Sequence, residues 1–144
     1  RAEFGNAHEL SVQMLPMAEQ SQNPALLVAA SVLAGAAPSY RGELVSSRQH
    51  LDRALALDRR EYHDIYLSMA NENWGISARR LHCISLWSLG YADQALALAR
   101  EAVTLAEQIG HPFSLGGAHF AVGVTCVLQR DWPASQLQFE KVFA

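Results

Sequence analysis

The chain has few charged residues and no excess of basic ones. Charged residues make up 17% of its 144 residues, and 11 lysines and arginines stand against 14 aspartates and glutamates, so the net charge is −3. A protein that binds nucleic acid through the phosphates needs a basic surface to neutralise them. The composition therefore argues against nucleic-acid binding, while the 50% of hydrophobic residues suffices for a buried core and argues against disorder.

Long apolar segments and cysteines are also scarce. The longest apolar run, Ala25 to Ala37, has 13 residues and contains Ser31 and Gly35, whereas a membrane-spanning helix needs about 20 apolar residues. The first residues show no cationic segment followed by an apolar one, so no secretion signal is visible. Cys83 and Cys126 lie in helical patterns and are expected to be buried, reduced thiols, with a disulfide or metal pair as the alternative. We therefore expect a cytoplasmic protein without a membrane partner.

Motifs that carry catalytic chemistry are absent. Gly116-Gly117 is not followed by Lys and Ser or Thr, as a phosphate-binding loop would require, and no Gly-x-Ser-x-Gly, His-Glu-x-x-His or Cys-x-x-Cys motif occurs. The nearest approach to a metal set is His82-Cys83 with His119 and Cys126. The last two are two helical turns apart, too far to share one ion unaided. We expect no catalytic residue, cofactor or metal site, and hence no enzyme.

The sequence does contain a helical hairpin. Residues from Ile76 to Gly110 read as two helices that fold back on each other at Leu89-Gly90-Tyr91, since glycine lets the chain reverse within one or two residues. The second helix has small and apolar residues at i, i+3, i+4 and i+7 spacing, which places a narrow stripe on one face. The stripe consists of Ala95, Leu98, Ala99, Ala102, Leu105 and Ala106. Its alanines allow the two helix axes to approach closely.

The hairpin is repeated around three positions, Gly42, Gly90 and Arg130, which are 48 and 40 residues apart. Small residues recur seven positions before and five positions after each of them. The earlier set is Gly35, Cys83 and Gly123, and the later set is Ser47, Ala95 and Ser135. The longer first spacing is assigned to an irregular insert at residues 58–73. Such a repeated arrangement indicates a stack of similar hairpins.

A small residue in the first helix, a turn and a packed second helix form the pattern of tetratricopeptide repeats. The chain resembles this family. The segment LGYADQALALAREAVTLAEQIGHPFSLGGAHFAVG is similar to the repeat region of large bacterial regulators that join a predicted ATPase to an adenylate/guanylate cyclase or a LuxR-type DNA-binding domain. The resemblance implies an all-α fold, an α-solenoid of antiparallel helical hairpins in a right-handed superhelix, with about seven helices.

The expected organisation is a single domain over residues 1–144, belonging to a longer protein. Residues 1–22 are expected to be the second helix of a partial repeat, and residues 24–57, 74–110 and 112–144 to be repeats. Prolines should interrupt two helices, Pro16 by a kink or break and Pro38 by ending its helix. The inner face of the first helix is expected at Leu10, Met14, Met17 and Ala18.

The resemblance also implies a concave groove lined by the first helix of each hairpin. The predicted partner-binding residues are Val32, Arg80, Ile84, Trp87, Phe120, Val124 and Val127. Because these positions lack the Lys/Asn set of chaperone-docking repeats, we expect an apolar groove that binds a helix or apolar peptide, or another domain of the parent chain. Arg79-Arg80 is expected either to contact an anion or to pair with Glu72 and the acidic residues at 58–64.

Two further possibilities concern ligands and self-association. A small molecule that contacts Trp87, Phe120 and Arg80 would make the chain a sensing segment that controls a linked ATPase, cyclase or DNA-binding domain. Repeats that bury their faces only against neighbours also leave apolar ends. We therefore expect self-association through surfaces around Met14 and Met17 at one end and around Phe139, Val142 and Phe143 at the other.

Overall fold

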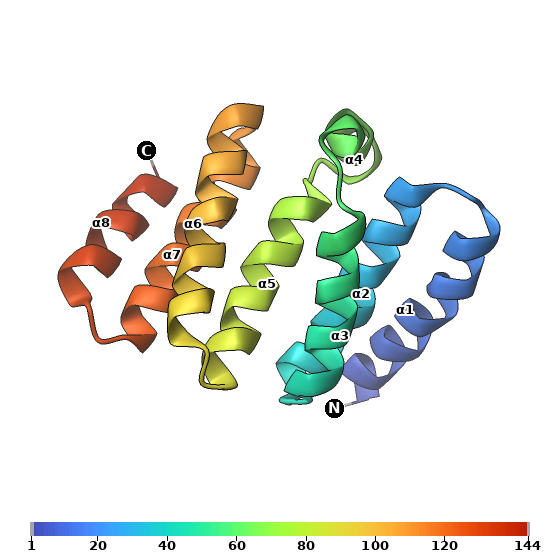
Figure 1. Cartoon of the computed structure of the whole chain (residues 1–144), viewed down its shortest axis with the longest axis horizontal. Helices are drawn as coiled ribbons and strands as arrows, with labels where there is room; N and C mark the ends of the chain where they lie inside the picture. The colour runs from blue at the N-terminus through green and yellow to red at the C-terminus, as the bar shows by residue number, and fades with distance from the viewer. Residues whose placement is uncertain (1, 144) are drawn as a thin grey trace.

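The computed structural model describes residues 2–143, with side chains from residue 9 onward. Over these residues the chain forms eight α-helices and one 3₁₀ turn, without a β-strand (Figure 1). The helices are α1 (Ala2–Gln20), α2 (Pro24–Arg41), α3 (Leu44–Leu57), α4 (His63–Ala70), α5 (Trp74–Ser88), α6 (Ala92–Ile109), α7 (Pro112–Leu128) and α8 (Trp132–Val142), with the turn η1 at Arg60–Tyr62. The all-α fold class is confirmed. The prediction of about seven helices was one short, because the insert forms a helix of its own.

Helix boundaries follow local capping chemistry. Asn23 Oδ1 accepts a hydrogen bond from the backbone N–H of Ala25 (3.0 Å) at the start of α2, and Asp131 Oδ1 accepts one from Ala134 (3.1 Å) at the start of α8. Such caps satisfy backbone donors that have no partner within the helix. The glycines that end α2 and α6, Gly42 and Gly110, have positive φ angles of 79° and 69°, which glycine adopts without strain.

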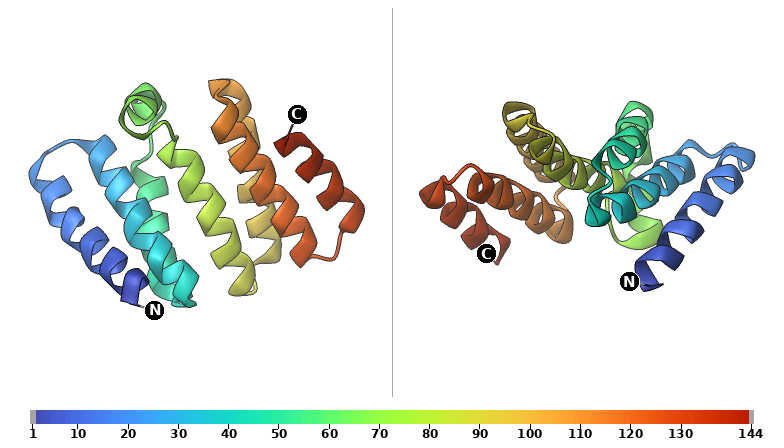
Figure 2. Two further views of the ribbon diagram at one scale, coloured as in Figure 1. Left: turned by 180° about the vertical axis from the view of Figure 1, so that it is seen from behind. Right: turned by 90° about the horizontal axis from the view of Figure 1, so that it is seen from below.

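The helices form a row of hairpins, with α1 at one end and α8 at the other (Figure 1). Helices α2 and α3, α5 and α6, and α7 and α8 pack as hairpins, and α5 also packs against α2, α3 and α7. Viewed from below, α3 and α6 lie on one side of the row that α2, α5 and α7 form (Figure 2). The arrangement is consistent with a helical repeat fold. A continuous right-handed superhelix remains a prediction.

The small residues at repeated positions are packing sites. Ser47 and Ala95 are fully buried, and Ser135 is nearly so. A side chain on Gly35 would begin 2.8 Å from Leu51 Cγ, and one on Gly123 would begin 2.6 Å from Phe139 Cε1. These positions therefore let α2 approach α3 and α7 approach α8 closely, which explains why the sequence repeats them.

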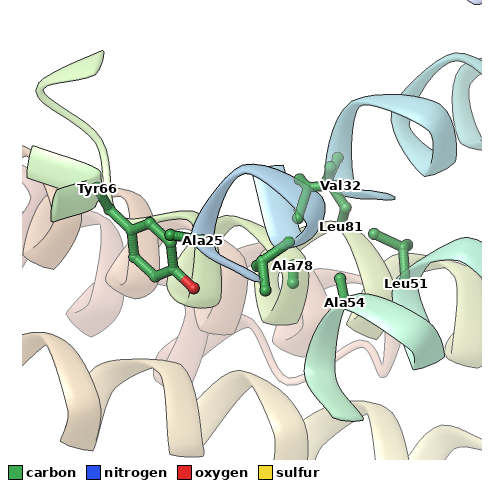
Figure 3. Packing of buried hydrophobic residues seen from close by; sticks show 8 residues of the cluster. Ala25, Val32, Leu51, Ala54, Tyr66, Ala78 and Leu81 are labelled. Carbon is green, nitrogen blue, oxygen red and sulfur yellow. The ribbon is translucent and has the colours of Figure 1, made fainter. Parts of the chain in front are cut away.

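The first core cluster lies where α2, α3, α4 and α5 meet (Figure 3). Its buried members are Ala25, Val28, Val32, Leu51, Ala54, Tyr66, Ala78 and Leu81. Tyr66 comes from the insert, and its side chain is fully buried. The insert is therefore a packed part of the fold, which sequence reasoning left undecided.

The predicted end of α2 at Pro38 does not occur, and α1 does not break at Pro16. Helix α1 continues through Pro16, and α2 continues past Pro38 to Arg41. A proline removes one backbone hydrogen bond, but Pro38 is fully buried in the last turn of α2, and its carbonyl accepts a hydrogen bond from Glu43 (2.9 Å). Tertiary packing and this closing bond offset the bond that is lost.

The predicted inner face of α1 was also wrong for most of its residues. Leu10, Met14 and Met17 are 62%, 42% and 69% exposed, whereas Ser11 and Ala18 are buried. Helix α1 packs against the alanine-rich α2, and small residues permit that close approach. Among the described residues, no helix is both long and apolar enough to cross a membrane.

Candidate functional site

The structure brings together some of the predicted groove residues and separates one from the rest. Arg80, Ile84 and Trp87 lie on α5, and Phe120, Val124 and Val127 lie on α7, its packing neighbour. Val32 lies on α2 but belongs to the first core cluster and is only 1% exposed. It does not line a groove, because its side chain faces α3 and α5 rather than solvent.

The aromatic and aliphatic groove residues on α5 are partly used in packing. Ile84 and Trp87 are half-buried and pack against the core cluster that includes Cys83, Leu86 and Val122. Val124 and Val127 are also half-buried. Phe120 differs, because its side chain is 47% exposed. Among the apolar groove residues, Phe120 is therefore the one most available to a partner.

A cavity of about 390 Å³ opens beside Phe120, between α5, α7 and the last turn of α8. We call it the α5/α7/α8 cavity. Its lining residues are Arg80, Pro112, Phe113, Gly116, Gly117, Phe120 and Val142. The sequence predicted Arg80 and Phe120 as partner contacts and Val142 as part of a self-associating end, whereas Phe113 was missed. Phe113 is 60% exposed. Phe113 directly follows Pro112 in the first turn of α7, and a large apolar residue at such a helix start is the sequence signal that could have found it.

The shape of this cavity depends on two glycines and a ring contact. Side chains added at Gly116 and Gly117 would begin 3.6 Å from the Val142 carbonyl and 3.8 Å from Arg80 Cδ, so the glycines leave backbone as part of the wall. The Phe120 ring packs against Phe139, with 5.9 Å between ring centroids and 48° between ring planes. The Phe120 side chain is thereby supported by α8 while it remains exposed.

Arg80 is the one charged side chain that lines the cavity. Arg80 Nη2 lies 3.1 Å from Glu72 Oε1, and the two side chains are 32% and 24% exposed. The Ser77 hydroxyl also donates to Glu72 Oε1, which fixes the carboxylate. Arg79 pairs with Asp58 at 2.9 Å. The predicted pairing of both arginines with nearby carboxylates is confirmed, and a guanidinium group retains further N–H donors beyond one such pair.

A second depression, which the sequence did not reveal, lies between α3, α5 and α6 and has a volume of about 340 Å³. His82, one of its lining residues, is nearly buried, and its Nε2 lies 2.8 Å from Asp52 Oδ1. Burial lowers the pKa of His82, although Asp52 opposes this. A neutral imidazole that donates to Asp52 links α3 to α5. In the sequence, only the i, i+4 spacing of Arg48 and Asp52 on α3 indicates a polar surface at this depression.

The cysteines and histidines of the possible metal set do not converge on an ion site. Cys83 and Cys126 are free and buried, as predicted, and Cys83 Sγ lies 3.7 Å from Thr125 Oγ1. His119 Nδ1 instead lies 2.9 Å from Gln138 Oε1. Among the side chains that the structure describes, residues 9–143, no group of three His, Cys, Asp or Glu residues could hold a metal ion.

No protein-family model, curated protein or solved structure matches this chain. The resemblance to tetratricopeptide repeats therefore continues to rest on the repeated small-residue positions and the helical hairpins.

Proposed function

We propose that this chain is a protein-interaction module, similar to the tetratricopeptide repeats of bacterial signalling regulators, and that it acts in the cytoplasm without catalysing a reaction. Its partner is a helical or apolar segment, either of another protein or of another domain of the parent chain. The observation that carries the proposal is the α5/α7/α8 cavity with two exposed phenylalanines at its wall. Aromatic side chains in desolvated pockets supply much of the binding energy at protein interfaces.

The chemistry of the cavity favours an apolar anchor side chain. Phe113, Phe120, Pro112 and Val142 offer apolar surface, and Arg80 is the one charged lining residue. A helical segment inserts such side chains at i, i+3, i+4 and i+7. A carboxylate on the partner, near the inserted side chain, could pair with the Arg80 donors that Glu72 leaves unused.

One observation favours small-molecule sensing as a second candidate function. The cavity volume of about 390 Å³ lies within the range of about 300–1,000 Å³ that is typical of small-ligand sites. An apolar carboxylate would match Phe120 and Arg80. In that case ligand binding would alter the equilibrium of a linked output domain.

Selection from a displayed library of amphipathic helical peptides tests the module. Peptides recovered on the wild-type chain should bind the variants Phe113→Ala and Phe120→Ala at least about tenfold more weakly, as interface aromatic residues do. Trp132→Ala is the matched control, because Trp132 is 61% exposed but does not line the cavity. Equal affinity for all three variants would place peptide binding elsewhere and contradict the proposal.

A thermal-shift screen of apolar carboxylates tests the second candidate with the same variants. Stabilisation of the wild-type chain that Phe120→Ala abolishes and Trp132→Ala retains would support sensing. Stabilisation that is equal in both variants would contradict binding in this cavity.

A further inference from the structure

Helix α1 exposes a stripe of large apolar side chains. Leu10, Met14 and Met17 are 62%, 42% and 69% exposed. Their i, i+4, i+7 spacing places them on one face of the helix. Three exposed apolar side chains in line differ from the isolated ones that most protein surfaces carry. We call this set the α1 stripe. Its spacing is that of anchor residues on a helix that binds in an apolar groove.

The charges of α1 complement those around the cavity. Helix α1 contains Glu3, Glu9 and Glu19 but no lysine or arginine. Glu19 pairs with Arg53 at 2.6 Å, whereas the exposed Glu9 directly precedes Leu10. The cavity has Arg80 among its lining residues, and the exposed Lys141 directly precedes its lining residue Val142. One chain thus has an acidic apolar helix at one end and, at the other, an apolar cavity with Arg80 and Lys141 beside it. Opposite charges of this kind favour the encounter and orientation of two copies.

The two surfaces cannot meet within one molecule. Helix α1 packs against α2 and lies at one end of the row of helices, whereas α7 and α8, which line the cavity, lie at the other end (Figures 1 and 2). The helices between them separate α1 from the cavity. A contact between stripe and cavity must therefore join different copies of the chain.

We propose that the α5/α7/α8 cavity binds the α1 stripe of a second copy, so that copies join head to tail. This inference rests on the proposed function, since it names one occupant of the binding cavity. Each copy uses two different surfaces, and such a heterologous contact leaves one stripe and one cavity free for further copies. Self-association and binding of another helical partner then compete for the same cavity. The local concentration of the chain therefore sets the fraction of molecules whose cavity is unoccupied.

Two variants separate the surfaces. Leu10→Glu with Met17→Glu disables the stripe and leaves the cavity intact. Phe113→Glu with Phe120→Glu disables the cavity and leaves the stripe intact. All four side chains are more than 40% exposed, so helical circular dichroism should be unchanged. Each pair of charges should weaken association at least about tenfold, because a charge buried in an apolar contact is strongly unfavourable.

Sedimentation velocity gives the readout. The wild-type chain should form species whose mass grows with concentration, and each variant alone should be monomeric. Mixed in equal amounts, the two variants should form a dimer and nothing larger, because each variant keeps only one of the two surfaces and the dimer uses both of them. Val45→Glu is the control, since Val45 is 64% exposed and belongs to neither surface, and it should assemble as the wild type does.

Three outcomes would overturn the inference: a wild-type chain that stays monomeric at its highest soluble concentration, a stripe variant that still self-associates, or a mixture that forms no dimer. The stripe variant also keeps the two tests distinct, because its cavity is free. If it binds the selected helical peptides but not the cavity variant, the proposed function stands and the head-to-tail contact fails. If it binds neither, both fail.

Discussion

Arg79 Nη1 lies 2.9 Å from Asp58 Oδ2 in an ion pair whose carboxylate is only 5% exposed. The same carboxylate accepts a hydrogen bond from the Tyr66 hydroxyl at 3.3 Å. Burial, together with Asp58, raises the pKa of Tyr66, which keeps the hydroxyl protonated as a donor. One carboxylate at the end of α3 therefore connects the insert helix α4 to α5.

Replacing Asp58 with asparagine should destabilise the fold. The substitution keeps the size of the side chain but leaves Arg79, which is 20% exposed, without a counter-charge. Removal of one partner from a buried pair costs about 3–5 kcal/mol, and partial hydration of Arg79 should bring the loss to about 2–3 kcal/mol. Urea unfolding followed by circular dichroism measures it.

The matched control for that experiment is Glu43→Gln. Glu43 pairs with Arg41 at 2.7 Å, but both side chains are 43% exposed. Exposed pairs contribute at most about 1 kcal/mol. Equal losses in the two variants would show that burial does not distinguish these ion pairs.

Gly75→Ala should also destabilise the fold, because it displaces Asp58 from its ion pair with Arg79. A Cβ on Gly75 would lie 2.3 Å from Asp58 Oδ2, and the buried carboxylate cannot move without leaving Arg79. Overpacking of this kind costs about 1–3 kcal/mol. Gly116→Ala is the control, because its nearest contact, the Val142 carbonyl, lies at an ordinary 3.6 Å. That variant should match or exceed the wild-type unfolding midpoint, since alanine favours helix.

Stability should fall as the solution is acidified from about pH 7 to about pH 5.5. Burial lowers the pKa values of His63 and His82 in the folded state. The unfolded chain, with histidine pKa values near 6.5, then binds more protons in this range, so the stabilisation present above about pH 6.5 is lost as pH falls through the lower folded values. Urea titrations across this range measure the slope.

His82→Gln should reduce that slope, because one of the two shifted groups no longer titrates. Glutamine still offers an N–H donor to Asp52. A stability that rises on acidification, or a slope that His82→Gln leaves unchanged, would contradict this origin.

Both thiols should be unreactive in the folded chain. Cys83 is fully buried and Cys126 is 5% exposed, and burial raises the pKa of each thiol. The thiolate is the reactive form, so reaction with Ellman's reagent should be at least about tenfold slower than in guanidinium chloride. The variants Cys83→Ser and Cys126→Ser each retain one cysteine, so the reaction rate of each thiol can be measured separately. Rapid modification of Cys83 in the native chain would show that α5 opens locally.

Local features of the structure could be predicted from the sequence because they depend on residues a few positions apart. Asn23 and Asp131 cap the helices that follow them, and Gly110 ends α6, each through its own conformation or a bond to a near neighbour. The repeated small residues were recognisable because each must fit between two helices of the same hairpin. These observations were enough for the all-α fold of paired helices.

The buried helix faces and the cavity depend instead on how the helices pack against one another in the tertiary structure. The spacing in α1 defines an apolar stripe, but which side of α1 faces α2 depends on how closely the two helices pack, so Ser11 is buried and Leu10 is exposed. Pro38 stays in its helix because surrounding helices bury it, and Val32 lies in the core for the same reason. The cavity beside Phe120 needs residues from α5, α7 and α8 at once. Helix boundaries arise from short-range bonds within the chain, whereas buried faces and cavities exist only once distant helices have packed.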